Sequence, residues 1–243
     1  QDRDGFSRLS VSHGERAGKL RTALMNLLDA NIDGVLLSPI EHGKEERRIF
    51  YETMDFLRHH HIRVVFIDRF RHDLDIPYVT TDNISASYRL TKLLIENGHR
   101  QIGFVRVTQV STVLRRLDGF RQACEEAGLP YHDDWDFFIE TREEDFRDEM
   151  EYFSERLLEM LKKHPVTALF ASNDQTGKAI IETLTKADLQ IPRDISLVTY
   201  DVDNIHESYP FHLTGVQQNL YGLGQEAAGL MMEMIRGETS QHT

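Results

Sequence analysis

The sequence lacks several features that mark secreted and membrane proteins. It has a single cysteine, Cys124, in 243 residues, so no disulfide can form within the chain and a disulfide-stapled extracellular fold is excluded. It has no apolar run of about 18 residues, the length that a bilayer-spanning helix needs. The first residues are charged and no apolar segment follows them, so the sequence shows no signal peptide.

Positive charge is also scarce. There are 28 Lys and Arg against 40 Asp and Glu, which gives a formal net charge of −12. Nucleic acids and anionic membranes both attract basic surfaces, so we do not expect this chain to bind DNA by itself or to bind a membrane. Hydrophobic residues make up 40% of the chain, which is enough for a buried core in one large domain or two lobes. The composition predicts a soluble, acidic, cytoplasmic domain.

Short apolar runs alternate with segments of helical periodicity along the chain. The apolar runs are typical of buried parallel strands and lie at residues 34–37, 64–67, 102–105, 168–171 and 195–198. The segments between and around them predict helices near residues 20–28, 45–60, 90–95, 117–127, 150–161, 179–184 and 223–234. Helices that separate short strands form right-handed βαβ units. The sequence therefore predicts an α/β fold built on parallel sheets.

Polar residues follow the predicted strands, at the edge where open parallel sheets bind ligands. They supply carboxylate, amide and guanidinium groups: Asp68, Asn173, Asp201, Gln218, and Arg115 or Arg116. Such groups suit a polyhydroxylated ligand, because each sugar hydroxyl both donates and accepts a hydrogen bond. Taken one at a time, these residues are explained at least as well by helix capping or by a solvated helix face. Asp174, for instance, is expected to cap the following helix.

Catalytic and metal-binding alternatives have little support. His59, His60 and His61 cannot chelate one metal ion together, because successive helical residues point to different faces. Cys124 lies in a helical run with no base beside it, as a buried structural thiol would. The sequence has no GxSxG elbow, P-loop or GxGxxG motif. We therefore favour a binding module over an enzyme and expect no cofactor and no metal.

Several motifs, taken together and in order, carry a family resemblance. They are VVFIDR (64–69), VTTDN (79–83), GHRQIGF (98–104), RLDGF (116–120), ALFASND (168–174), IPRDISLVTYD (191–201) and LTGVQQ (213–218). Over about residues 31–237 the chain resembles the effector-binding domain of LacI/GalR transcriptional regulators. The resemblance implies a fold of two Rossmann-like lobes, as in periplasmic sugar-binding proteins of type I, with a ligand cleft between them. One lobe would comprise residues 1–106 plus 219–243, and the other residues 107–218.

The same resemblance implies a site and a function. Its effector contacts fall on Asp68, Arg116, Asn173, Asp201 and Gln218, with Arg116 now preferred over its neighbour. The two aspartates would accept hydrogen bonds from ligand hydroxyls, the arginine would hold two oxygens, and the asparagine would both donate and accept. The family function would be to sense a sugar or sugar-like effector as a homodimer. Operator DNA would be bound through a domain of LacI or GntR type that this chain does not include.

The chain also departs from the family pattern. Compared with the family, it lacks the first strand and helix and the last strand. Thr199 and Asp188 stand where the family usually has glycine, and Thr199 is expected to narrow the floor of the cleft. Two other functions remain open: a transport-type solute-binding protein and, less favoured, an enzyme on the same fold.

Overall fold

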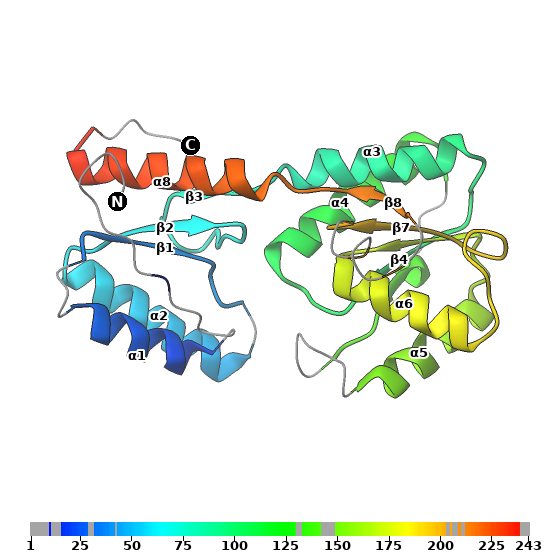
Figure 1. Cartoon of the computed structure of the whole chain (residues 1–243), viewed down its shortest axis with the longest axis horizontal. Coiled ribbons are helices and arrows are strands. Elements are labelled where there is room, and N and C mark those ends of the chain that lie inside the picture. Colours follow the sequence, from blue (N-terminus) through cyan, green and yellow to red (C-terminus); the bar gives the residue numbers. More distant parts are fainter. Residues whose placement is uncertain are drawn as a thin grey trace. The chain divides into compact units, whose positions relative to one another are not determined.

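The computed structural model describes residues 10, 16–28, 32–41, 43–129, 133–141, 149–202, 205, 209 and 212–238. Contacts divide the chain into two units, residues 1–80 with 220–243 and residues 81–219 (Figure 1). The chain therefore passes from one unit to the other between Thr80 and Thr81, and returns between Asn219 and Leu220. None of the described helices is long and apolar enough to span a bilayer.

The first unit is a parallel three-stranded sheet with helices on both faces. The strands are β1 (Gly34–Leu37), β2 (Arg63–Ile67) and β3 (Tyr78–Val79), in that order. The helices are α1 (Ala17–Leu28), α2 (Lys44–His59) and α8 (Leu220–Arg236). Figure 1 shows α1 and α2 on one face of the sheet and α8 on the other. Successive residues of β2 point to opposite faces of the sheet: Phe66 packs with α1 and α2, and Val65 packs with α8.

The second unit is a parallel five-stranded sheet in the order β5-β4-β6-β7-β8. The strands are β4 (Ile102–Arg106), β5 (Asp136–Phe138), β6 (Ala168–Ala171), β7 (Ser196–Tyr200) and β8 (Thr214–Val216). The helices are α3 (Asn83–Glu96), α4 (Ser111–Glu126), α5 (Met150–Lys163) and α6 (Asp174–Lys186), and a short 3-10 turn covers Asp133–Trp135. Both faces are covered, which explains why these strands are continuous apolar runs.

Side-chain alternation assigns each strand residue to one layer of the second unit. In β4, Phe104 packs with α3 and α4, whereas Val105 packs with α5 and α6. In β6, Phe170 joins the α3–α4 layer and Leu169 joins the opposite one. The ring centroids of Phe104 and Phe170 lie 5.1 Å apart, and Phe120 of α4 completes the aromatic cluster.

The expected α/β class with two parallel-sheet units is confirmed, but one expected boundary differs from the observed division. The family resemblance places residues 81–106 in the first lobe, whereas contacts in the structure group them with the second unit. The reason is strand pairing: β4 lies between β5 and β6 in the second sheet. A periodicity pattern shows that a strand exists but not which sheet it joins.

Strand β5 was not expected. It has only three residues, and Arg106 at the end of β4 contacts two of them. Nε and one terminal nitrogen of Arg106 each donate to a different oxygen of Asp136, at 2.8 Å in both cases. The guanidinium carbon also lies 4.2 Å from the ring centroid of Phe138. Phe137, between Asp136 and Phe138 in β5, packs in the core.

Five helices end in the same left-handed turn. Residues Gly98, Gly128 and Gly237 follow α3, α4 and α8 with positive φ, as the glycine signal predicts. His61 and Asp188 take the same place after α2 and α6, with φ of 57° and 56°. At the end of α6, the N–H of Asp188 donates to the carbonyl of Thr185, and that of Leu189 donates to the carbonyl of Leu184. This is the paired hydrogen-bond pattern of a Schellman cap.

The conformation of Asp188 leads to a first prediction. Replacing Asp188 with Gly should raise the free energy of unfolding by about 1 kcal/mol, because glycine adopts a left-handed backbone without a steric penalty. Urea unfolding of the two proteins measures this difference. The matched control is Gly98→Asp at the same position after α3, where a new Cβ would meet no atom within 4 Å. That variant should lose stability; equal stability of all three proteins would contradict the prediction.

Candidate functional site

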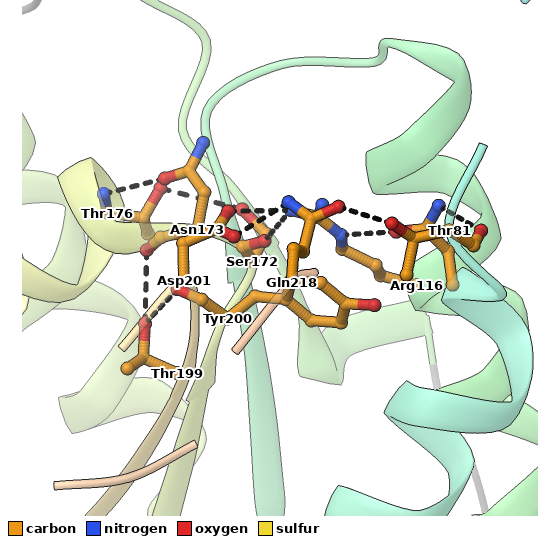
Figure 2. A network of polar contacts seen from close by, with 10 residues as sticks. Thr81, Arg116, Ser172, Asn173, Thr176, Thr199, Tyr200, Asp201 and Gln218 are labelled. Atoms are coloured by element: carbon orange, nitrogen blue, oxygen red, sulfur yellow. Dashed lines mark hydrogen bonds and ion pairs between the residues drawn. The ribbon is translucent and has the colours of Figure 1, made fainter. Parts of the chain in front are cut away.

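The structure brings together four of the five residues that the sequence singled out. Arg116, Asn173, Asp201 and Gln218 lie in the second unit and belong to one network of polar contacts (Figure 2). Asp68 lies in the first unit, directly after β2.

Arg116 is buried at the centre of this network, with 4% of its surface exposed. Its Nε donates to Oδ1 of Asn83 at 2.8 Å, and NH1 donates to the carbonyl of Ser172 at 2.8 Å. NH1 also lies 3.7 Å from Oδ2 of Asp201. The guanidinium carbon lies 3.6 Å from the centroid of the Tyr200 ring. A buried charge with this many partners is a built feature of the unit, not a solvated helix residue.

Close packing of α3 against α4 makes the Arg116–Asn83 contact possible. Gly119, one turn after Arg116, has no side chain at the point where the helices meet. A Cβ at this position would lie 2.1 Å from the carbonyl oxygen of Ile84. The RLDGF motif thus combines the buried arginine with the glycine that lets its hydrogen-bond partner approach.

Asp201 and Gln218 come from the ends of the neighbouring strands β7 and β8. Nε2 of Gln218 donates to Oδ1 of Asp201 at 2.7 Å. Asp201 has a φ of 60°, in the left-handed region that aspartate tolerates better than most residues. Gln218 is 9% exposed, and its other amide atom, Oε1, accepts a hydrogen bond from Oγ1 of Thr81 at 2.7 Å.

Asn173 is the N-cap of α6, so the expected cap at Asp174 is wrong. Oδ1 of Asn173 accepts from the N–H of Thr176 at 2.8 Å, and Asp174 lies in the first turn, 3.7 Å from Nζ of Lys178. The fully buried Thr199 donates to the carbonyl of Asn173 at 3.2 Å. Its hydroxyl occupies space that a side chain on Gly177 would fill: a Cβ there would lie 2.9 Å from the Thr199 oxygen.

Asp68 repeats in the first unit the backbone conformation of Asp201. It directly follows β2 and has a φ of 68°. Its N–H donates to the carbonyl of Val79 at 2.9 Å, and its own carbonyl accepts from the hydroxyl of Thr80.

Burial dominates the electrostatics of the second unit's site. Burial raises the pKa of Asp201, while the Arg116 charge and the hydrogen bond from Gln218 oppose this effect. Burial also raises the pKa of Tyr200 to about 12, again against the nearby guanidinium. The phenol stays protonated and can serve as a neutral platform for Arg116.

Two members of the network, Thr81 and Asn83, do not stand out in the sequence. Both lie in the VTTDN motif, but a polar residue just before a helix is usually explained by capping. Asp82 is the actual cap of α3, because its carboxylate accepts from the N–H of Ser85 at 3.0 Å. Asn83 is 3% exposed although it opens a helix, and such burial of an amide is not visible in the sequence.

The rejected metal and nucleophile alternatives gain no support. Nδ1 of His59 and of His60 each lies within hydrogen-bond distance of a helix carbonyl, and no group of His, Cys, Asp and Glu in the described part of the chain could hold a metal ion. Burial raises the pKa of the Cys124 thiol to about 12, which keeps it protonated and unreactive.

Comparison with known proteins places this architecture in a family. Residues 91–243 match the model of the periplasmic binding protein-like domain. The HTH-type transcriptional repressor PurR of Glaesserella parasuis is 31% identical over 242 residues, which cover 98% of this chain and 67% of that repressor. The chain belongs to the LacI family. Its relatives are named as transcriptional repressors and regulators, so regulation rather than solute transport is the role of this LacI-family domain.

Solved structures of the family share the fold. A putative ribose operon repressor from Burkholderia thailandensis superposes with a TM-score of 0.77 at 24% identity, covering 97% of this chain and 83% of its own. The regulator CelR, solved as a cellobiose complex, gives a TM-score of 0.71 at 27% identity, covering 92% of this chain and 64% of its own.

The raised pKa of Asp201 leads to a prediction about pH. Between the ordinary value of 3.8 and the higher value in the folded protein, the native state keeps a proton that the unfolded chain has released. The contribution of Asp201 to stability is therefore fully present below pH 3.8 and is lost as pH rises through the folded pKa.

The variant Asp201→Asn removes this titration and keeps a residue that accepts a positive φ. The free energy of unfolding of the wild type minus that of the variant should fall as pH rises through this window and then level off. Urea unfolding at a series of pH values measures it. A difference that stays flat, or that grows with pH, would show that burial does not dominate at Asp201.

Proposed function

We propose that this domain binds a small hydroxylated effector, a sugar or a close relative of one, at the strand-end network of its second unit. The supporting observation is that Arg116, Asp201 and Gln218, from one helix and two strand ends, are in direct contact. Asn173, at a third strand end, directly follows Ser172, whose carbonyl accepts from Arg116, and its own carbonyl accepts from Thr199. Asp68, at the corresponding strand end of the first unit, is proposed to accept from a ligand hydroxyl as well.

The geometry refines the proposed role of each residue. Oδ1 of Asn173 already accepts from the helix N–H, so its Nδ2 is the group that can donate to a ligand oxygen. Oδ1 of Asp201 already accepts from Gln218, so Oδ2 would accept from a ligand hydroxyl beside Arg116. Adjacent donors and acceptors of this kind match a vicinal diol, in which each hydroxyl does both.

The proposed regulatory output depends on parts beyond this chain. Effector binding would shift the domain between two states, and a DNA-binding segment outside this sequence would respond by binding or releasing operator DNA. We further propose a homodimer that acts in the cytoplasm. The names of the relatives as repressors and regulators support the proposed control of operator DNA.

A thermal-shift panel tests ligand binding. The compounds would be D-ribose and cellobiose, further pentoses and hexoses, sugar phosphates and nucleobases. A ligand that binds only the native state at 100 times its Kd should stabilise the domain by about 2.7 kcal/mol and raise Tm by about 5–10 °C. A sugar that raises Tm supports the proposal. A Tm shift with nucleobases alone would support effector sensing but contradict a sugar as the effector. No Tm shift with any compound would count against both claims.

The variant Arg116→Lys then tests the site. Lysine keeps the positive charge beside Asp201 but loses the planar donor fork, so the affinity for any compound that shifts the wild type should fall about tenfold or more. Isothermal titration calorimetry measures it. Alanine is a poorer choice here, because it would leave a cavity and an unpaired carboxylate.

Arg115→Lys is the matched control, one residue away on the same helix and so on another face. Its affinity for the same compound should equal that of the wild type. An unchanged affinity in Arg116→Lys, or equal losses in both variants, would remove Arg116 from the binding site.

A further inference from the structure

The network of the second unit closes into a ring of five residues. Oγ1 of Thr81 donates to Oε1 of Gln218 at 2.7 Å, and Nε2 of Gln218 donates to Oδ1 of Asp201 at 2.7 Å. Oδ2 of Asp201 lies 3.7 Å from Arg116, whose Nε donates to Asn83 at 2.8 Å. Nδ2 of Asn83 donates to the carbonyl of Thr81 at 2.9 Å and so closes the ring. Figure 2 shows Gln218 between Thr81 and Asp201.

The ring joins the two places where the chain passes between its units. Thr81 is the first residue of the second unit after the outward passage, and Gln218 lies one residue before Asn219, the last residue before the return. The two residues are 137 positions apart in the sequence. One hydrogen bond therefore connects the outward and return segments, and the next connects both to Asp201.

The direction of these hydrogen bonds is fixed by chemistry. An ionised carboxylate only accepts, so Gln218 must turn its Nε2 towards Asp201 and its Oε1 towards Thr81. The hydroxyl of Thr81 must then be the donor. Without this donor nothing in the ring would hold the carbonyl end of the amide, and the amide would lose its preferred orientation towards Asp201.

Helix capping does not account for the hydroxyl of Thr81. The cap of α3 is the neighbouring Asp82, whose carboxylate accepts from Ser85. The hydroxyl of Thr81 instead reaches Gln218, on the segment that follows β8.

We propose that Thr81 is a positioning residue for the effector site: its hydroxyl orients the Gln218 amide, and through that amide it couples the Asp201 carboxylate to both passages of the chain between the units. This inference rests on the proposed function, in which Asp201 contacts the ligand. Its physical content is a coupling between Thr81 and Asp201 that exists without any ligand.

The test compares Thr81→Val, which removes the hydroxyl at nearly constant shape, with Thr81→Ser, which keeps it. The readout is the pKa of Asp201 in the full chain, followed by the carboxyl carbon signal in NMR with ¹³C-labelled aspartate. The hydrogen bond from Gln218 holds the Asp201 pKa down against burial. Thr81→Val should therefore raise this pKa further, and Thr81→Ser should leave it unchanged.

A double-mutant cycle shows whether the effect runs through Gln218. Gln218→Leu alone should raise the Asp201 pKa, and adding Thr81→Val to it should cause no further change. Thr91→Val is the control for the loss of a buried hydroxyl, since Oγ1 of Thr91 donates within α3, to the carbonyl of Ser87. This control should leave the Asp201 pKa at its wild-type value.

Hydrogen exchange provides a second readout that does not depend on titration. Thr81→Val should speed amide exchange in residues 214–220, on the distant return segment, and Thr91→Val should not. An Asp201 pKa that does not respond to Thr81→Val, or one that responds equally on the Gln218→Leu background, would overturn the proposal.

The outcomes separate this inference from the proposed function. The pKa and exchange measurements use the unliganded protein, so they can succeed when no compound of the panel binds. Conversely, a ligand could raise Tm while the Asp201 pKa does not respond to Thr81→Val. That result would support the proposed function and overturn only the positioning role of Thr81.

Discussion

Burial of the Arg116 guanidinium is the constraint on which the polar site of the second unit depends. A charge taken out of water costs several kcal/mol unless its donors find acceptors in good geometry. Here the acceptors come from the start of α3, from the carbonyl after β6 and from the carboxylate after β7. The need to satisfy one buried side chain thus fixes the helix-to-helix approach at Gly119 and the positions of two strand ends at once.

The backbone contributes a second constraint, which both units share. Asp68 and Asp201 each directly follow an inner strand of their sheet with φ of 68° and 60°. A left-handed conformation costs a non-glycine residue about 1–2 kcal/mol. Strain of this kind persists where the surroundings over-determine it, which occurs most often at binding sites. Aspartate tolerates it because its short polar side chain can bond locally, so the residue type satisfies both the backbone and the proposed chemistry.

Sequence patterns predicted most of the helices and strands, though not the short β5, and they picked out the strand-end residues, because periodicity and strand-to-helix junctions are local properties. The family resemblance places the unit boundary after residue 106. The apolar pattern of β4 could not correct this, since it is the same in either sheet and only the pairing of β4 with β5 and β6 decides. Spacing alone also left Arg115 and Arg116 equivalent, and the family resemblance favoured the buried one. Neither spacing nor the family resemblance pointed to Thr81, because the partner of its hydroxyl, Gln218, lies 137 positions away in the sequence.

The polar groups of the second unit's site already bond to one another, and this restricts which ligands can bind there. The ligand gains nothing from polar groups that remain paired, so it must either meet atoms with spare capacity or exchange one hydrogen bond for another. In the proposed site, Oδ2 of Asp201, 3.7 Å from Arg116, would accept from a ligand hydroxyl, and Nδ2 of Asn173 would donate to a ligand oxygen. A molecule with a methyl group in place of the hydroxyl would leave these groups desolvated and unpaired, a penalty that discriminates far more strongly than apolar contact does. For the proposed effector, selectivity for hydroxyl groups would thus follow from the contacts that hold the unliganded site together.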